Sequence, residues 1–143
     1  MKAKKLMKLA AWLVLPAALV LVSGCAGGTE TATQVIGDIT TQEASAMIQE
    51  NAGNPGFVIL DVRTPEEYAD GHIEKALNLD YYSETFRDEL DELDKGKTYL
   101  VYCRSGKRSR AAADIMEELG FGNGYNMRGG IVQWQEDGLP TVK

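Results

Sequence analysis

The sequence has few of the residues that hold disulfide scaffolds or metal centres together. Its 143 residues include two cysteines and one histidine. So few cysteines exclude a disulfide-rich fold, and with a single histidine they exclude a four-ligand zinc site unless carboxylates take part. With 15 glycines and 4 prolines, the chain cannot be collagen-like. What is present, 44% hydrophobic and 25% charged residues, is the composition of a globular protein whose length fits one domain.

Positive charge is scarce outside the N-terminal segment. The formal net charge is −6, but residues 1–24 hold four lysines and no acidic residue. The remaining chain therefore has 11 Lys and Arg against 21 Asp and Glu, a formal charge of −10. A body this acidic repels phosphate backbones, so we expect no nucleic-acid partner.

The N-terminal segment has the pattern of an export signal. Four lysines precede an unbroken run of 14 apolar residues, 9–22. That run is shorter than the roughly 20 residues needed to span a bilayer core, and it ends in small residues. The lysines are Lys2, Lys4, Lys5 and Lys8.

The end of this segment, Val22-Ser23-Gly24-Cys25, resembles the lipobox of bacterial lipoproteins. The resemblance implies that residues 1–24 are a signal peptide and that Cys25 carries a lipid. The protein would then be exported and anchored to a membrane, facing the periplasm or the cell exterior. Two alternatives stay open: ordinary cleavage nearby with Cys25 incidental, or an uncleaved anchor helix. Residues 25–35 are mostly small and polar and predict a flexible tether, so the folded domain is expected over 36–143.

The rest of the sequence alternates between strand and helix patterns. Helix starts are marked by hydroxyl caps at Thr40 and Thr64, and Gly71 ends the second helix. Short apolar runs predict strands that are buried on both faces. This order predicts an α/β domain with a parallel sheet and helices on both faces, and with ligands beyond the carboxyl ends of the strands. Strands are expected at 57–60, 76–79, 98–102 and 125–127, and later helices at 83–93, 110–119 and 131–137.

Cationic residues are concentrated in one short segment directly after the strand 98–102. Four of the eight residues in 103–110 are Lys or Arg, in a chain that is otherwise acidic. Backbone N–H groups of such a segment, together with the start of a helix, converge readily on an anion. The segment therefore predicts a small anion site next to Cys103.

The same surroundings favour the ionised form of a thiol. Lowering the pKa of a thiol from about 8.5 to about 6.5 requires roughly 2.7 kcal/mol. A helix N-terminus supplies about 0.3–1 kcal/mol of this, so nearby cations and N–H donors must supply the rest. Cys103 is therefore predicted to be a nucleophile, and the alternative is an inert cysteine buried at the end of a strand.

The spacing of residues around Cys103 distinguishes between several enzyme classes that use such a loop. A tyrosine-phosphatase loop needs an arginine six positions after the cysteine, but that position is Ser109. A Walker A loop also fails, because Val101 stands where its first glycine is required. A Cys–His pair of the papain type would have to use His72, the one histidine.

The segment Cys103-Arg104-Ser105-Gly106-Lys107-Arg108 resembles the active-site loop of the rhodanese-like, or thiosulfate sulfurtransferase, family. Residues 61–78 and Gly129-Gly130 with Trp134 resemble the family's flanking signatures. The resemblance implies a single rhodanese-like domain in which Cys103 takes sulfane sulfur from thiosulfate as a persulfide and passes it to a thiol or cyanide. It implies no metal and no organic cofactor. The substrate would be bound by Arg104, Ser105, Gly106, Lys107, Arg108 and Ser109.

Three further residues are predicted to support the structure. Asp61 and Arg63 are expected to form a buried ion pair, with substrate binding as the alternative. His72 is expected to fix a turn, because sulfite leaves without needing a proton donor. The sequence leaves three other functions open: a persulfide relay that serves a partner protein, arsenate reduction or phosphate-ester hydrolysis, and a non-enzymatic anchor.

Overall fold

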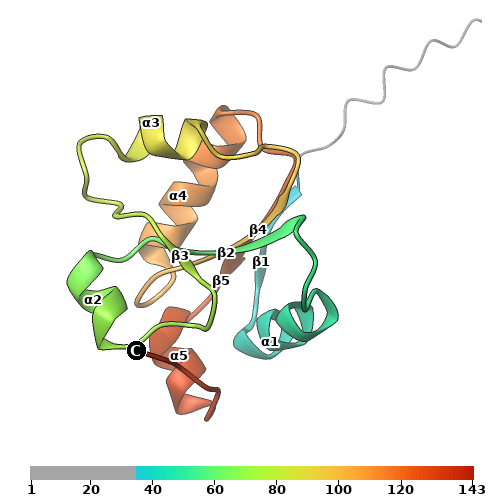
Figure 1. The fold of residues 1–143 in the computed structure, drawn as a ribbon, viewed down its shortest axis with the longest axis vertical. Coiled ribbons are helices and arrows are strands. Elements are labelled where there is room, and N and C mark those ends of the chain that lie inside the picture. The colour runs from blue at the N-terminus through green and yellow to red at the C-terminus, as the bar shows by residue number, and fades with distance from the viewer. Residues whose placement is uncertain (1–34) are drawn as a thin grey trace, which may run out of the picture.

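The structure, a computed structural model, describes residues 35–143 (Figure 1). The predicted signal peptide, Cys25 and nearly all of the tether lie outside the described residues. Among the residues described, no helix has both the length and the apolar character that crossing a bilayer requires.

The described chain is one α/β domain built on a five-stranded sheet. All neighbouring strands are parallel, in the order β1-β5-β4-β2-β3. The strands are β1 (Val35–Ile39), β2 (Phe57–Asp61), β3 (Leu77–Asn78), β4 (Thr98–Tyr102) and β5 (Asn123–Met127). The helices are α1 (Thr41–Glu50), α2 (Pro65–Asp70), α3 (Phe86–Asp91), α4 (Lys107–Glu118) and α5 (Gly130–Glu136).

Helices cover both faces of the sheet, as the sequence predicted. Helices α3 and α4 lie on one face, and α1 and α5 lie on the other (Figure 1). The first face is packed by side chains such as Leu90 and Met116 against Val101. The second is packed by Ile131 and Trp134 with Leu100 and Tyr102 from alternate positions of the same strand. Burial on both faces is why β4 reads as a continuous apolar run.

The predicted capping signals are confirmed. Thr40 and Thr64 each accept a hydrogen bond from the backbone of the third helical residue, whose glutamate side chain bonds back to the cap. Gly71 follows the last residue of α2. These caps fix where α1 and α2 begin, so their starts were readable from local sequence alone.

Other boundaries differ from the prediction. Strand β1 was not predicted, because Gly37 and Asp38 interrupt its apolar pattern; its pairing with β5 stabilises it. Helix α3 is shorter than 83–93. Helix α4 begins at Lys107 rather than at 110, because Gly106 in the left-handed region (φ 94°) ends the loop early. Residues 107–110, the last four of the predicted cationic segment, therefore form the first turn of α4.

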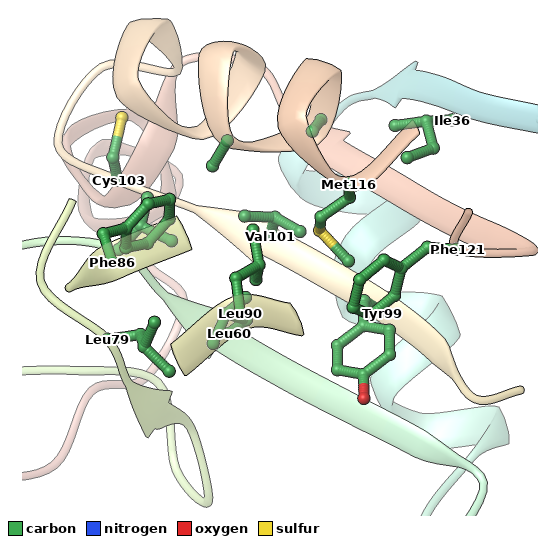
Figure 2. Packing of buried hydrophobic residues seen from close by; sticks show 13 residues of the cluster. Ile36, Leu60, Leu79, Phe86, Leu90, Tyr99, Val101, Cys103, Met116 and Phe121 are labelled. Atoms are coloured by element: carbon green, nitrogen blue, oxygen red, sulfur yellow. The ribbon is translucent and has the colours of Figure 1, made fainter. Parts of the chain in front are cut away.

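Cys103 lies at one end of the core cluster on the α3–α4 face. Figure 2 shows its sulfur directed away from the neighbouring apolar side chains and toward the helix above them. The residue immediately follows β4, at the carboxyl edge of the sheet. The parallel sheet thus places the one described cysteine where ligands bind in such folds.

Candidate active site

The sulfur of Cys103 is held by donors from the loop and from the first turn of α4. The Gly106 amide donates to Sγ at 3.1 Å, and the Ser109 hydroxyl lies 3.4 Å from Sγ. Cys103 is 1% exposed and Ser109 is fully buried. Donors directed at a shielded sulfur stabilise negative charge on it better than water-exposed donors do.

These contacts decide the ionisation of the thiol. Burial acts to raise the pKa of Cys103, but hydrogen bonds from the Ser109 hydroxyl and from the amides of Ser109, Ser105 and Gly106 act against it. Their combined effect is larger, so the pKa of Cys103 is lowered from its ordinary value. The thiolate, which is the nucleophilic form, is favoured by donors rather than by a general base.

The Ser109→Ala variant is expected to form the reactive thiolate less readily. Removing the hydroxyl raises the pKa of Cys103, so its alkylation rate at pH 7 should fall about 10-fold, corresponding to one lost hydrogen bond to a charged group. The rate–pH profile measured with iodoacetamide should move to higher pH and reach the wild-type rate at alkaline pH. A variant that reacts slowly at every pH would contradict the role assigned to the hydroxyl.

Arg108 is paired within the protein rather than free for a substrate. Its guanidinium makes a two-pronged contact with Glu67, with Nη1–Oε2 at 2.7 Å and Nη2–Oε1 at 2.8 Å. The same guanidinium lies over the ring of Tyr82, 5.3 Å from its centroid. Glu67 therefore balances the charge of Arg108 in this structure, and the contact of Arg108 with the substrate stays a prediction. Arg104 and Lys107 are exposed and make no ion pair among the described residues.

The Arg108 contact makes part of the stability depend on pH. The hydrogen bond from Arg108 is the main reason that the pKa of Glu67 is lowered to about 2. A carboxylate with a lowered pKa in the folded state stabilises the protein above the unfolded pKa of 4.5, and this contribution is lost as the pH falls toward 2.

The Glu67→Gln variant should lose about 1 kcal/mol of unfolding free energy at pH 7, a figure discounted for the partial exposure of the pair. In urea unfolding from pH 7 to pH 3, the difference from the wild type should shrink as the pH falls. Glu118→Gln, which breaks an exposed pair with Arg87, is the matched control and should change stability by less than about 0.5 kcal/mol. A loss of unfolding free energy in Glu67→Gln that is the same at all pH values would show that the charge of Glu67 does not cause it.

The start of α5 holds the backbone of the loop. The amide of Ile131 donates to the carbonyl of Cys103 at 2.9 Å, and the amide of Val132 donates to the carbonyl of Arg104 at 3.2 Å. A side chain at Gly130 would place its Cβ 2.4 Å from both carbonyl oxygens. Gly130 is therefore explained by the close approach of the α5 backbone to the loop, and Gly129 by its left-handed backbone, φ 77°.

The three residues predicted to be structural occupy structural positions. Arg63 donates to the buried carboxylate of Asp61, with the shortest contact at 2.6 Å, and to the carbonyl of Gly71 at 2.7 Å. His72 stacks on the Tyr68 ring at 3.7 Å, and its Nδ1 lies 3.0 Å from the Tyr68 carbonyl. Its backbone pairs with Val142, which ties the C-terminal segment to the domain. Each of these groups is engaged within the protein.

Sequence reasoning missed Glu67 as a neighbour of the loop, because 41 residues separate it from Arg108. It also missed Asp38 and Asn126, which lie side by side on β1 and β5. A signal for the second pair was present: both are polar residues near the carboxyl ends of strands, where parallel sheets bind ligands. Of the predicted site residues, the fold brings Ser105, Gly106 and Ser109 to the sulfur of Cys103.

Comparison with known proteins connects this geometry to a family. The model of the rhodanese-like domain matches residues 40–137. A sulfurtransferase from Allochromatium vinosum is 36% identical over 100 residues, which cover 70% of this chain and 92% of that protein. A tRNA uridine(34) hydroxylase from Erwinia tasmaniensis is 31% identical, but the match covers 85% of this chain and only 36% of that longer protein. A crystal structure of a rhodanese-related protein from Thermoplasma volcanium superposes with a TM-score of 0.61 at 33% identity, covering 73% and 96% of the two chains.

Proposed function

The chain belongs to the rhodanese-like domain family, and from this membership we propose that it is a sulfurtransferase that moves sulfane sulfur from thiosulfate, or a similar small donor, to a thiophilic acceptor. The observation that carries the proposal is the Cys103 sulfur with the Gly106 amide at 3.1 Å and the Ser109 hydroxyl at 3.4 Å. These donors stabilise the thiolate before the reaction and the persulfide after it.

In the first step, the Cys103 thiolate attacks the outer sulfur of thiosulfate. The S–S bond of thiosulfate breaks, its electron pair leaves with sulfite, and a persulfide anion remains on Cys103. The total charge is unchanged and no proton moves, so the step requires donors and cations rather than an acid or a base. Arg104 and Lys107, the exposed cations of the loop, attract the incoming dianion.

In the second step, the acceptor attacks the outer sulfur of the persulfide and the Cys103 thiolate returns. A thiol acceptor becomes a persulfide, and cyanide becomes thiocyanate. The two half-reactions share one covalent intermediate, so the kinetics should be ping-pong.

A persulfide relay between proteins is the second candidate function. It needs the same loop but poor turnover of free thiosulfate. The burial of Cys103 supports the small-donor function, because an anion of a few atoms reaches a shielded sulfur more easily than a protein persulfide does. Hydroxylation of tRNA is an activity of longer relatives, of which this chain spans about a third.

The test uses the full-length chain. After treatment with thiosulfate, intact-mass measurement should show one added sulfur atom per chain, and digestion should map it to the peptide that holds Cys103 and not to the peptide with Cys25. Sulfite should appear in equal amount, and cyanide should remove the sulfur. Slow loading from thiosulfate with fast loading from a protein persulfide would favour the relay, and loading from neither would refute both.

We also propose that the protein is exported and held at a membrane by a lipid on Cys25. Support comes from the basic start, the 14-residue apolar run and the ending Val22-Ser23-Gly24-Cys25. Metabolic labelling with palmitate in a bacterial host should mark the wild type and not Cys25→Ala; labelling of both would refute the anchor.

A further inference from the structure

A hollow of about 400 Å³ lies beside the loop at the carboxyl ends of β1 and β5. We call it the β5 pocket. Its walls include Asp38 and Asn126 from the strands, Arg128 after β5, and Gly106, Lys107 and Arg110 from the loop and α4. Cys103 does not line it, so the β5 pocket is distinct from the group of donors around the Cys103 sulfur.

One residue that lines the β5 pocket, Asn126, has an unsatisfied hydrogen-bond acceptor. Asn126 is 3% exposed, and its Nδ2 donates to Asp38 Oδ1 at 2.8 Å. That bond fixes the amide orientation, and Asn126 Oδ1 is left as the one buried side-chain oxygen or nitrogen without a partner in residues 35–143. An unpaired buried carbonyl oxygen costs about 1–3 kcal/mol, so its presence in a pocket wall points to a ligand that donates an N–H or O–H.

Three cations, Lys107, Arg110 and Arg128, line the β5 pocket against one carboxylate, Asp38. Besides the hydrogen bonds from Thr40, the charge of Arg128 also helps to lower the pKa of Glu43. Arg110 is matched by Asp114 at 2.5 Å and by Asp38 at 3.5 Å. Lys107 and Arg128 are exposed and form no ion pair with any residue in the described part of the chain. In a protein as acidic as this one, two such cations beside a buried acceptor favour a ligand with an anionic group and a hydrogen-bond donor.

Gly106 connects the β5 pocket to the reacting sulfur. It lines the pocket, and its amide donates to Cys103 Sγ at 3.1 Å. A molecule held in the pocket is therefore separated from the sulfur by the backbone of one loop residue. For a thiol anchored there by its polar groups to reach a persulfide on Cys103, its sulfur must extend over the edge of the loop at Gly106.

We propose that the β5 pocket is the subsite for the sulfur acceptor and that it selects thiols carrying both a carboxylate and an N–H donor, such as an N-acylated cysteine. Arg128 and Lys107 bind the carboxylate. Asn126 Oδ1 accepts from the N–H after a small shift of the pocket wall, because this oxygen is buried in the structure. The acceptor thiol loses its proton to solvent, and its thiolate attacks the outer sulfur of the Cys103 persulfide. The bond between that sulfur and Sγ breaks, and the electron pair returns to Cys103. This proposal rests on the proposed function and specifies its second half-reaction.

The experiment separates the two half-reactions. Full-length protein is loaded with thiosulfate, freed of excess reagent, and checked by intact mass for one added sulfur. The persulfide is then discharged with N-acetylcysteine or with neutral 2-mercaptoethanol, and each rate constant is expressed per thiolate. The ratio of the two constants reports recognition of the polar groups, independently of how quickly the protein was loaded.

Arg128→Gln should lower this ratio about 5- to 20-fold relative to the wild type, the loss expected for one charged contact at a partly exposed site. The control is Lys97→Gln, which removes a cation at the opposite end of β4 and should leave the ratio unchanged. In the wild type, added salt should lower the ratio, because exposed charges are screened. The same ratio in Arg128→Gln and the wild type would overturn the proposal.

A second comparison tests the role of Asn126. In the wild type, the rate constant per thiolate for discharge of the persulfide should be larger with N-acetylcysteine than with 3-mercaptopropionate, which has the carboxylate and lacks the N–H. The Asn126→Ala variant should remove this preference. Equal rate constants per thiolate for the two thiols in the wild type would overturn the assignment of Asn126 Oδ1 as the acceptor for the ligand N–H. Absence of the added sulfur in the first step would instead refute the proposed function, so the two failures are distinguishable.

Discussion

Replacing Cys103 by serine is expected to abolish sulfur uptake. Cys103→Ser should gain no sulfur from thiosulfate, and sulfite release with cyanide should fall at least about 1,000-fold, to the level without protein. The physical reason is that a serine hydroxyl stays protonated at neutral pH and has little affinity for divalent sulfur. The donors at Sγ, from Gly106 and Ser109, stabilise an anion that the serine cannot form.

The fold should survive this substitution, so the loss can be assigned to chemistry. Serine is close to cysteine in volume, and the donors around position 103 provide it with hydrogen bonds. We expect the unfolding free energy to change by less than about 1.5 kcal/mol, measured by denaturant unfolding. Sulfur uptake by Cys103→Ser equal to that of the wild type would place the persulfide elsewhere, with Cys25 the one other cysteine in the chain.

The second large effect is expected at Gly130, which contacts no substrate in the proposed reaction. In Gly130→Ala, the new Cβ would lie 2.4 Å from the carbonyl oxygens of Cys103 and Arg104. Both carbonyls are fixed by α5 amides, so the loop or the helix must move. We expect a loss of about 3 kcal/mol or more in unfolding free energy. A displaced loop also misplaces its donors, so sulfur uptake should slow about 100-fold in the protein that remains folded.

Gly138→Ala is the matched control for this prediction. Gly138 also has a left-handed backbone, with φ 73° against 58° for Gly130, but no heavy atom lies within 4 Å of the point that its Cβ would occupy. It should therefore show only the conformational cost of a side chain there, about 1 kcal/mol, with unchanged sulfur uptake. Equal effects of the two substitutions, in urea unfolding and in uptake rate, would contradict the close-packing argument.

Several features of the domain were predictable because their causes are local. The capping residues Thr40 and Thr64 act on amides three residues away, and α1 and α2 begin where those caps predict. Strand β4 was predicted at its observed bounds, because a strand buried on both faces must be apolar throughout. Cys103 follows that strand directly, so its place at the carboxyl edge of the sheet followed from the chain order.

Other features depended on contacts that sequence position does not encode. The four cations in 103–110 predicted an anion site, with Arg104, Lys107 and Arg108 among the residues that bind the substrate. The sequence did not show that the fold pairs Arg108 with Glu67, or Arg110 with Asp114 and Asp38. Strand β1 has a weak strand pattern in the sequence, and it forms because it pairs with β5. That pairing was not predictable, because β5 lies far along the chain. Ser109, predicted in the loop as a substrate contact, lies in α4 against the sulfur.

The sequence alone determined the fold class and the family resemblance, and it predicted Cys103 as the nucleophile. Helix caps, apolar runs and a cationic loop after a buried strand all act over a few residues, so they can be read from the sequence. The tertiary structure decided which of the loop's cations are free, which donors reach the sulfur, and that Asn126 keeps an unpaired oxygen in a pocket beside it. Those outcomes depend on Glu67, Asp38 and the α5 backbone, which only folding brings to the loop. Charge balance and close packing are properties of neighbours in space, so they were fixed by the arrangement of the sheet.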